Sequence, residues 1–394
     1  MWRVIIKQDR LKNFRSGHPW IFSGAIHSVR GEGENGGLCR LEDESGNFLA
    51  VGYLNEKSDI AVRVISRREE LVDAVFFERR FAALKDERER LIGDRSDAYR
   101  LVFSEADFLP GLIVDRYGDV LVLQCHTLGM ELLKPLVVEA LAAVFAPRAI
   151  YERSDVGARR REGLDDNQTG LLYGVEPGEA IITENGLRFA VDVANGQKTG
   201  FYLDQRENRA AILPHCKNCR VLNCFSYTGG FAVYAAKGGA TQVVSIDVSK
   251  PALKLAEKNF ELNGFKSGKF EFIAADVFDF LPALPKNSYD VIILDPPSFA
   301  KTRWELKSAF KAYTTINSKA LAALKDGGIL ATSSCTGYLD ELTFIKILHQ
   351  SSTIVGCDLK TLKIAAHPPD HPYNLSFPEG RYLKFLIVQK TPRP

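Results

Sequence analysis

The sequence predicts an α/β protein whose largest part is a doubly wound parallel sheet with an antiparallel last strand. Short apolar runs alternate with helix-like stretches from Val221 to Leu330, a period typical of such sheets. Residues 1–70 hold only short apolar runs divided by turn residues, as in a small barrel-like β domain. Residues 71–182 combine a linker helix with a compact α+β module. The sheet is therefore expected within residues 183–394.

Composition and charge exclude several classes of protein. The 394 residues carry a formal net charge of +2, so binding to nucleic acid would have to come from local basic surface. No apolar run approaches the roughly 18 residues that span a bilayer, and charges stand where a signal peptide would be apolar. Seven scattered cysteines argue against a disulfide framework, and Cys216 with Cys219 makes only half of a zinc site. We expect a cytoplasmic protein without membrane or metal; a homo-oligomer is left open.

The segment Ser16–Phe22 interrupts the strand rhythm of the first 70 residues. Arg15, His18 and Trp20 would face a phosphate and a base of RNA, because cations position backbones and aromatic faces stack unpaired bases. The alternative is that Trp20 and Phe22 fill the interior of the barrel.

The middle region opens with a helix that Asp73 can cap and that ends at Gly93. The α+β module follows, with strand-like runs at Gly111–Asp115, Val120–His126 and Ala149–Arg153 and a helix from Leu132 to Phe145. Its dense positive cluster contains Arg153, Arg159 and Arg160, which would contact phosphates; the alternative is a solvated loop without a ligand.

The stretch Val221–Gly239 predicts a strand, a tight turn and a helix, the opening of a nucleotide-binding βαβ unit. A dinucleotide would need glycines for its pyrophosphate, but bulky Phe225 and Tyr227 stand there. An adenosine ligand without phosphate, S-adenosylmethionine, fits better. The turn residues expected to contact it are Phe225, Ser226, Tyr227, Thr228 and Gly229. The alternative is an ordinary turn with no ligand.

The loop that precedes this unit is expected to fold over the same ligand. Phe201 and Tyr202 would form an apolar wall, and Arg206 would bind the methionine carboxylate. Asp204 and Gln205 would supply polar contacts. Upstream, Asn185 and Gly186 between apolar runs predict a hairpin.

Polar residues follow the predicted strands at the edge where ligands bind in such sheets. Asp247 comes about 20 residues after the glycine turn, which suits a ribose hydroxyl. Asp276 suits the adenine amine. Asp295 and Cys335 follow the next two strands, and Asp295 is expected to contact the cofactor too. Any one of the aspartates alone could instead cap a helix.

The segment Asp295–Phe299 indicates methyl transfer to a base. Its two prolines stiffen the turn, leaving Asp295 directed into the site and Phe299 available for stacking. Cys335 indicates that the methylated atom is carbon 5 of a pyrimidine, because a thiolate that adds at carbon 6 turns carbon 5 into a nucleophile. Asp295 would supply a proton to ring nitrogen 3. Three alternatives stay open. Cys335 could be a small buried side chain without a chemical role. The methylated group could be an exocyclic amine of guanine or adenine, or the chain could be an RNA-binding assembly factor with a vestigial cofactor site.

Several motifs resemble the PUA-domain methyltransferases that make 5-methylcytosine in large-subunit ribosomal RNA. They are Ser16–Phe22, Leu109–Gly118, Gly200–Arg206, Asn223–Gly230, Asp295–Phe299 and Ser334–Cys335, and together they span nearly the whole chain. The resemblance implies a PUA RNA-binding domain over residues 1–70, a Rossmann-like class I methyltransferase domain over 183–394, and Cys335 as nucleophile. It also implies S-adenosylhomocysteine as product. Many 5-methylcytosine enzymes in general carry a further cysteine where Ser298 stands here, so the resemblance does not identify the base that removes the carbon-5 proton.

Overall fold

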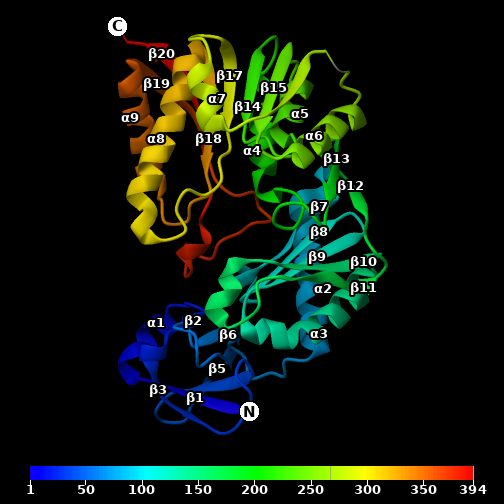
Figure 1. Cartoon of the computed structure of the whole chain (residues 1–394). Helices are drawn as coiled ribbons and strands as arrows, with labels where there is room; N and C mark the ends of the chain where they lie inside the picture. The colour runs from blue at the N-terminus through cyan, green and yellow to red at the C-terminus, as the bar shows by residue number, and fades with distance from the viewer. Residues whose placement is uncertain (267, 394) are drawn as a thin grey trace. The chain divides into compact units, whose positions relative to one another are not determined.

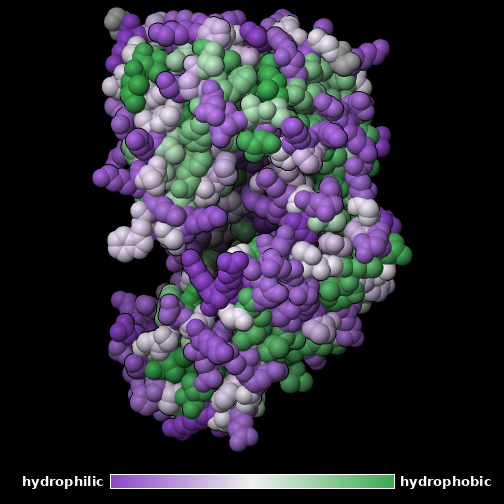
Figure 2. Space-filling view, in the orientation of Figure 1, coloured by the Kyte–Doolittle hydropathy of each residue, from purple (hydrophilic) through white to green (hydrophobic). Residues whose placement is uncertain are grey.

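The computed structural model describes residues 1–266 and 268–393. These residues fall into two compact units, coloured along the chain in Figure 1. The first unit consists of Met1–Ile182, Val191–Leu203 and Pro369–Gly380, and the second of Thr183–Ala190, Asp204–Pro368 and Arg381–Pro394. On the face drawn in Figure 2, hydrophilic residues are spread over both units and hydrophobic residues form separate groups among them.

A six-stranded sheet begins the first unit and confirms the barrel-like β domain expected there. Its spatial order is β2-β6-β5-β4-β1-β3, and β1 runs parallel to β4. Because β2 and β3 remain as edges, the sheet is a half-barrel. The strands are β1 (Trp2–Ile6), β2 (Trp20–Ile21), β3 (Ile26–Arg30), β4 (Leu38–Glu42), β5 (Phe48–Leu54) and β6 (Val62–Ser66), with the short helix α1 (Leu11–Arg15) after β1.

The middle module holds a five-stranded sheet in the order β11-β10-β9-β8-β7. Asp73 caps the linker helix, as predicted, by accepting a hydrogen bond of 2.9 Å from the Phe76 backbone N–H. The sequence pattern predicted the three inner strands but not β7 and β11. The elements are α2 (Ala74–Ile92), β7 (Ala98–Phe103), β8 (Leu112–Tyr117), β9 (Val120–Cys125), α3 (Leu128–Phe145), β10 (Ala149–Ser154) and β11 (Gln168–Gly174).

The half-barrel and the middle module share one hydrophobic core. Val51 and Tyr53 of β5 belong to the same buried cluster as Leu112 and Met130. The Tyr53 hydroxyl is also satisfied across this boundary, because it donates to the Pro110 carbonyl at 2.9 Å. Two separately predicted domains therefore pack as one unit.

A seven-stranded sheet forms the centre of the second unit, in the order β16-β15-β14-β17-β18-β20-β19 (Figure 1). Strands β14 to β18 pair in parallel and β20 is antiparallel to both of its neighbours, which confirms the predicted class of sheet. The strand order reverses between β14 and β17, the usual place for a ligand in such folds. The strands are β14 (Arg220–Cys224), β15 (Gln242–Asp247), β16 (Phe270–Ala274), β17 (Tyr289–Leu294), β18 (Leu324–Ser334), β19 (Cys357–Ala365) and β20 (Lys384–Pro392).

Helices cover both faces of this sheet. One buried core cluster joins α7, α8 and α9 to alternate residues of β14, β15, β17, β18 and β20. The helices α5 and α6 contact β15 and β16 and contribute nothing to that cluster, so they cover the opposite face. The helices are α4 (Arg206–Ala211), α5 (Gly230–Lys237), α6 (Lys250–Leu262), α7 (Val277–Ala283), α8 (Leu306–Ala323) and α9 (Glu341–Val355).

The predicted hairpin is present as β12 (Glu179–Glu184) and β13 (Leu187–Asp192). Its turn residues Asn185 and Gly186 have φ values of 50° and 75°, the conformation that two-residue hairpin loops favour. Among the described helices, none is both long and apolar enough to cross a membrane.

Candidate active site

The parallel strands of the second unit bring the predicted polar residues to one edge of the sheet. Asp247 ends β15, and Asp276, Asp295 and Cys335 follow β16, β17 and β18 within two residues. Because β14 to β18 point the same way, these four positions and the turn after β14 share the carboxyl edge.

The turn after β14 is held in an unusual backbone conformation. Phe225 and Tyr227 have φ values of 57° and 47°, in the left-handed region that bulky residues rarely occupy. The Asp247 carboxylate accepts hydrogen bonds from the backbone N–H of Tyr227 at 2.8 Å and of Ser249 at 2.9 Å, which stabilises the turn. Strain of this kind concentrates at ligand-binding sites.

Gly229 serves helix packing in this turn. Its φ is +76°, and an added Cβ would lie 3.0 Å from the Cβ of Ala256 on α6. The neighbouring Thr228 carbonyl accepts a hydrogen bond of 2.8 Å from Asn259 of the same helix. The requirement for glycine thus comes from the approach of α6 to the turn, and not from a ligand alone.

Several buried polar side chains near the turn fit a polar ligand such as S-adenosylmethionine. Both side-chain polar atoms of Asn223, the Ser226 Oγ and the Thr228 Oγ1 have no hydrogen-bond partner among the described residues. Buried groups of this kind are costly unless something satisfies them. Asp247 lies directly beside them through its bond to Tyr227.

Asp276 caps a helix, which was the alternative to a ligand contact. Its carboxylate accepts a hydrogen bond of 2.7 Å from the Phe278 backbone N–H and so caps α7. The side chain is exposed, so capping leaves room for a further contact. The adenine contact stays a prediction.

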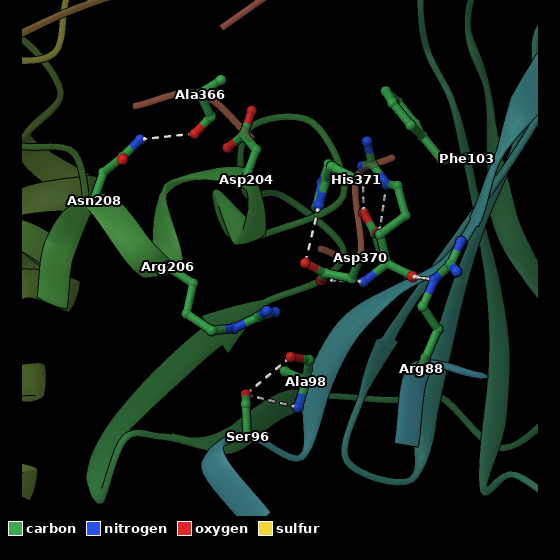
Figure 3. A network of polar contacts seen from close by, with 12 residues as sticks. Arg88, Ser96, Ala98, Phe103, Asp204, Arg206, Asn208, Ala366, Asp370 and His371 are labelled. Atoms are coloured by element: carbon green, nitrogen blue, oxygen red, sulfur yellow. Dashed lines mark hydrogen bonds and ion pairs between the residues drawn. The ribbon is translucent and has the colours of Figure 1, made fainter. Parts of the chain in front are cut away.

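Asp295 is oriented by two elements of the second unit. Its Oδ1 accepts a hydrogen bond of 2.8 Å from Gln205 Nε2 and another from the Ser333 hydroxyl of β18. Gln205 is held in turn by Asn208, whose Nδ2 donates to Gln205 Oε1 at 2.6 Å. The same Nδ2 reaches the Ala366 carbonyl at 3.4 Å (Figure 3).

Asp204 and Arg206 lie on the same segment as Gln205 (Figure 3). Asp204 accepts a hydrogen bond of 2.6 Å from the Tyr382 hydroxyl. Arg206 is fully buried, and its Nε lies 3.8 Å from the Glu184 carboxylate. Arg209 pairs with the same carboxylate at 2.6 Å, so one glutamate serves two arginines. Binding of a methionine carboxylate by Arg206 stays a prediction.

Phe201 and Tyr202 belong to the first unit, whereas the site described here is built from the second. The backbone of Phe201 is tied to the Tyr117 hydroxyl through its N–H at 3.2 Å and its carbonyl at 3.3 Å. The Tyr202 hydroxyl donates to Gln197 at 2.6 Å, and Lys198 lies 4.4 Å from the centre of its ring. Their role as an apolar wall is untested.

Cys335 lies next to the Asp295–Phe299 segment. Its side chain is half-buried, and its Sγ is 4.0 Å from the Pro296 carbonyl oxygen. Ser298, in the place of the second cysteine, bonds to the hydroxyl of Thr336 at 3.1 Å, and Thr336 bonds to the Tyr313 hydroxyl at 2.9 Å.

The other cysteines differ from Cys335 in exposure or surroundings. Cys39, Cys125, Cys216, Cys224 and Cys357 are buried, and burial raises the pKa of each thiol. Cys219, half-buried as well, lies outside the strand-end edge, between α4 and β14. Cys335 is thus the half-buried cysteine at the strand-end edge. Among the described residues, no group of three or more histidines, cysteines or carboxylates is placed to hold a metal.

Phe299 is part of a row of aromatic rings. Its ring centre is 4.6 Å from that of Tyr313 and 5.7 Å from that of Phe278, and Phe278 is 6.5 Å from Phe225. Phe299 is therefore half-buried against its neighbours.

In the first unit, His18 and Trp20 pack against protein rings. The Trp20 ring centre is 4.7 Å from that of Phe377, and its indole N–H donates to Glu105 at 2.8 Å. The His18 ring contacts both Trp20 and Phe377, at 5.8 and 5.6 Å. Phe22 is 50% exposed, so the expectation that it fills the barrel is wrong. Arg15 is exposed.

The arginines of the middle module mostly hold the fold. Arg153 is buried and donates to the carbonyls of Val193 and Gly196 at 2.9 and 2.7 Å. Arg159 is also buried, and donates to the Asp165 carbonyl at 2.6 Å and to Glu131 at 2.9 Å. Arg160 is exposed and pairs with Asp166. Burial removes Arg153 and Arg159 from any surface that RNA would touch.

A basic cavity that the sequence pattern did not predict lies in the first unit. It has a volume of about 360 Å³, and we call it the arginine cavity because its lining includes Arg67, Arg68, Arg79 and Arg80. Arg79 pairs with Glu70, and burial lowers the pKa of Arg67 and Arg80. Phe108 also lines it, 46% exposed and with a φ of 58°. These arginines come from the loop after β6 and from α2, and the sequence pattern alone does not show that they converge.

Comparison with known families divides the chain in two. Residues 136–337 match the S-adenosylmethionine-dependent methyltransferase family, and residues 4–67 match the PUA-like domain family. The second match lies in the half-barrel and the first includes the whole strand-end edge.

Curated relatives match over almost the full length. The chain is 41% identical to the ribosomal RNA large subunit methyltransferase I of Aeromonas hydrophila and 43% identical to that of Tolumonas auensis, each alignment covering 98% of both chains. Among solved structures, a protein described as a methyltransferase and complexed with SAH has a TM-score of 0.84 at 26% identity, covering 99% of this chain and 100% of that one.

Proposed function

This chain belongs to the ribosomal RNA large subunit methyltransferase I family of S-adenosylmethionine-dependent methyltransferases, and from that premise we propose that it methylates carbon 5 of a cytosine in large-subunit ribosomal RNA. The observation that supports this choice of atom is Cys335, half-buried and 4.0 Å from the carbonyl of Pro296 in the Asp295–Phe299 segment. A thiol beside that segment has a role in attack on a pyrimidine ring and none in methylation of an amine.

Cys335 and Asp295 have separate roles in the proposed reaction. The Cys335 thiolate adds to carbon 6 of the cytosine, and Asp295 gives a proton to ring nitrogen 3. Carbon 5 of the resulting enamine is then nucleophilic, and S-adenosylmethionine supplies the electrophilic methyl group. Water takes the proton from carbon 5, the bond between carbon 6 and sulfur breaks to release the Cys335 thiolate, and nitrogen 3 returns its proton to Asp295, which restores the ring. Gln205 and Ser333 hold Asp295 in place throughout.

The cofactor would be bound by the turn after β14 and by the strand ends beside it. Asp247 suits the ribose, and the unsatisfied Asn223, Ser226 and Thr228 side chains suit other polar groups. Arg206, Asp204 and Gln205 are proposed for the methionine part, with Phe201 and Tyr202 as apolar neighbours.

Methylation of an exocyclic amine is the second reading, and the packing of Phe299 counts against it. That reading uses Phe299 to stack the target base, but its ring already contacts Tyr313 and Phe278. The assembly-factor reading requires a vestigial cofactor site, which the unsatisfied polar groups at the turn disfavour.

One assay tests base, atom and RNA together. The protein is incubated with labelled S-adenosylmethionine and ribosomal RNA from cells that lack the enzyme, and the nucleosides are separated by mass. We expect labelled 5-methylcytosine in large-subunit RNA. Labelled methylguanine or methyladenine would favour the amine reading, and no cofactor binding at all would favour the assembly factor.

The Cys335→Ala variant separates chemistry from binding. We expect turnover to be lost, because Cys335 is the group proposed to add to carbon 6, while S-adenosylhomocysteine binding measured by calorimetry is retained. Cys219→Ala, the other half-buried cysteine, is the matched control and should keep full activity. Full activity of Cys335→Ala would contradict the covalent route.

For RNA, we propose the arginine cavity together with Arg15 and Arg160 as contact surface in the first unit. Arginines bind phosphates, and the exposed Phe108 ring at the cavity offers a face for a base. His18 and Trp20, which already pack against Phe377, are proposed only as support for this region.

A further inference from the structure

Lys384 is a buried charge that the proposed reaction has not used. It is the first residue of β20 and lies directly opposite Ser334 of β18, the residue before Cys335. Its relative exposure is 3%. Buried lysines are rare unless a carboxylate pairs with them, because taking the ammonium out of water is costly.

The contacts of the Lys384 ammonium are with neutral groups around Cys335. Its Nζ donates to the Tyr382 carbonyl at 2.7 Å and to the carbonyl of Thr336, the residue that follows Cys335. No carboxylate of the described residues forms an ion pair with it. Two of its three N–H groups are thereby used.

Lys390, on the same strand, shows the usual arrangement. Its relative exposure is 5%, and its Nζ donates to the Leu324 carbonyl at 2.7 Å. It also pairs with Asp326 at 3.2 Å. The two lysines are equally buried, but only Lys390 has a carboxylate, so Lys384 requires another anion.

We propose that the anion is the Cys335 thiolate, and that the Lys384 ammonium stabilises it, which makes Lys384 a positioning residue for the nucleophile. Burial lowers the pKa of Lys384 to about 8, and a negative charge on Cys335 opposes that shift. The interaction is mutual, so the ammonium favours the thiolate by the same amount. When the neutral amine takes the thiol proton, one S–H bond breaks and one N–H bond forms.

Other charged groups around this pair do not replace the lysine. The negative charge of Asp340, at the start of α9, favours the Lys384 ammonium and disfavours the Cys335 thiolate. The positive charge of Arg381 disfavours the ammonium and favours the thiolate, but Arg381 is paired with Glu341. Tyr313 of α8 stays neutral because burial raises its pKa to about 12. Asp295 is held by Gln205 and Ser333.

The inference rests on the proposed role of Cys335, but its test needs no methyl transfer. The full-length protein is pulsed with iodoacetamide between pH 6 and 10, and alkylation of Cys335 is quantified by mass spectrometry of its peptide. For Lys384→Met we expect the midpoint of the pH profile to rise by about one unit, which lowers the rate near pH 7 about tenfold. Lys384→Arg should keep the wild-type midpoint.

Lys390→Met is the matched control, because it removes an equally buried lysine of β20 away from the thiol. It should leave the Cys335 profile unchanged. If Lys384→Met does not fold, Lys384→Gln keeps donors for the Thr336 and Tyr382 carbonyls and gives the same comparison. An unchanged midpoint in the folded Met or Gln variant would overturn the inference. A shifted midpoint together with full activity of Cys335→Ala would instead support the pairing of Lys384 with Cys335 and contradict the covalent route.

Discussion

Asp295 is positioned before any substrate arrives. The Gln205 amide and the Ser333 hydroxyl both donate to its Oδ1, from two separate elements of the second unit. Such fixed orientation reduces the reorganisation needed in the transition state. Asp247 is fixed in the same way by the Tyr227 and Ser249 backbone N–H groups.

Replacing Asp295 by asparagine should therefore affect the reaction more than binding. The amide of the asparagine has no acidic proton to give to ring nitrogen 3, and positioned acids contribute about 10²–10⁴-fold to rates. For Asp295→Asn we expect kcat to fall by about 10²-fold or more while S-adenosylhomocysteine affinity changes much less, both measured on the purified protein. An equal loss of affinity and kcat/KM would assign Asp295 to cofactor binding alone.

The buried Lys384 also makes a prediction about stability. Its pKa of about 8 in the folded protein lies below the roughly 10.4 of an unfolded lysine, so between these values the folded state binds fewer protons. Its contribution to the free energy of unfolding is therefore lowest below pH 8, rises with pH between 8 and about 10.4, and is constant above that.

Urea unfolding of wild type and Lys384→Met at pH 8 and pH 10 measures this contribution. The wild type should gain more stability over that interval than the variant, because the variant lacks the titrating lysine and its Cys335 thiol, without the ammonium, loses its proton at higher pH. Parallel changes in the two proteins would show that the Lys384 ammonium is not destabilised by burial.

Among the elements, the strand–turn–helix from β14 to α5 is the one whose structure and ligand were best predicted by its residue pattern. The alternation of apolar runs was enough to place β14 to β18, because fully buried parallel strands are short and apolar. The packing reason for Gly229 was not predictable, since Ala256 lies far from it in sequence. Strand β11 was missed because it is largely exposed and only three consecutive residues of it are apolar. Strand β7 is mostly buried, but Arg100 interrupts its apolar residues.

Gly229 and Gly264 allow the packing of the turn to be tested. Both have positive φ values, +76° and +73°, but an added Cβ meets Ala256 at 3.0 Å in the first case and nothing within 4 Å in the second. Alanine at either site incurs the left-handed backbone cost of about 1–2 kcal/mol. Gly229→Ala should lose about 1–3 kcal/mol more, from crowding against α6.

Chemical unfolding of the two variants measures this difference directly. Equal losses would mean that α6 moves aside without cost. In that case ligand approach, and not helix packing, would explain the glycine.

For the whole molecule, side-chain burial decided which predicted basic residues remain available. By residue type alone, Arg153, Arg159 and Arg160 were equally good candidates for a phosphate contact. The fold buries Arg153 and Arg159, whose guanidinium groups donate to backbone carbonyls. Conversely, the arginine cavity depends on residues from β6 and α2 meeting in space. Burial and convergence are tertiary properties, so the sequence predicted the fold and the strand-end residues better than the RNA surface.

The arginine cavity is expected to supply part of the electrostatic affinity for RNA. The double variant Arg67→Gln/Arg68→Gln should weaken ribosomal RNA binding and reduce the slope of log affinity against log salt concentration, by about one for each phosphate that is no longer bound. Arg30→Gln/Arg90→Gln, two exposed arginines of the same unit outside the cavity, is the control with equal charge change. Equal effects of the two double variants would mean that net charge matters and the cavity does not.

The most direct test of the covalent route is to trap the adduct. Large-subunit RNA transcribed with 5-fluorocytidine is incubated with the protein and S-adenosylmethionine, then separated under denaturing conditions. Fluorine cannot leave carbon 5 as a proton does, so the adduct should persist as a cofactor-dependent band, with the RNA attached at Cys335 by peptide mass analysis. Methylation of ordinary RNA without any trapped complex, or attachment at another residue, would contradict the role given to Cys335.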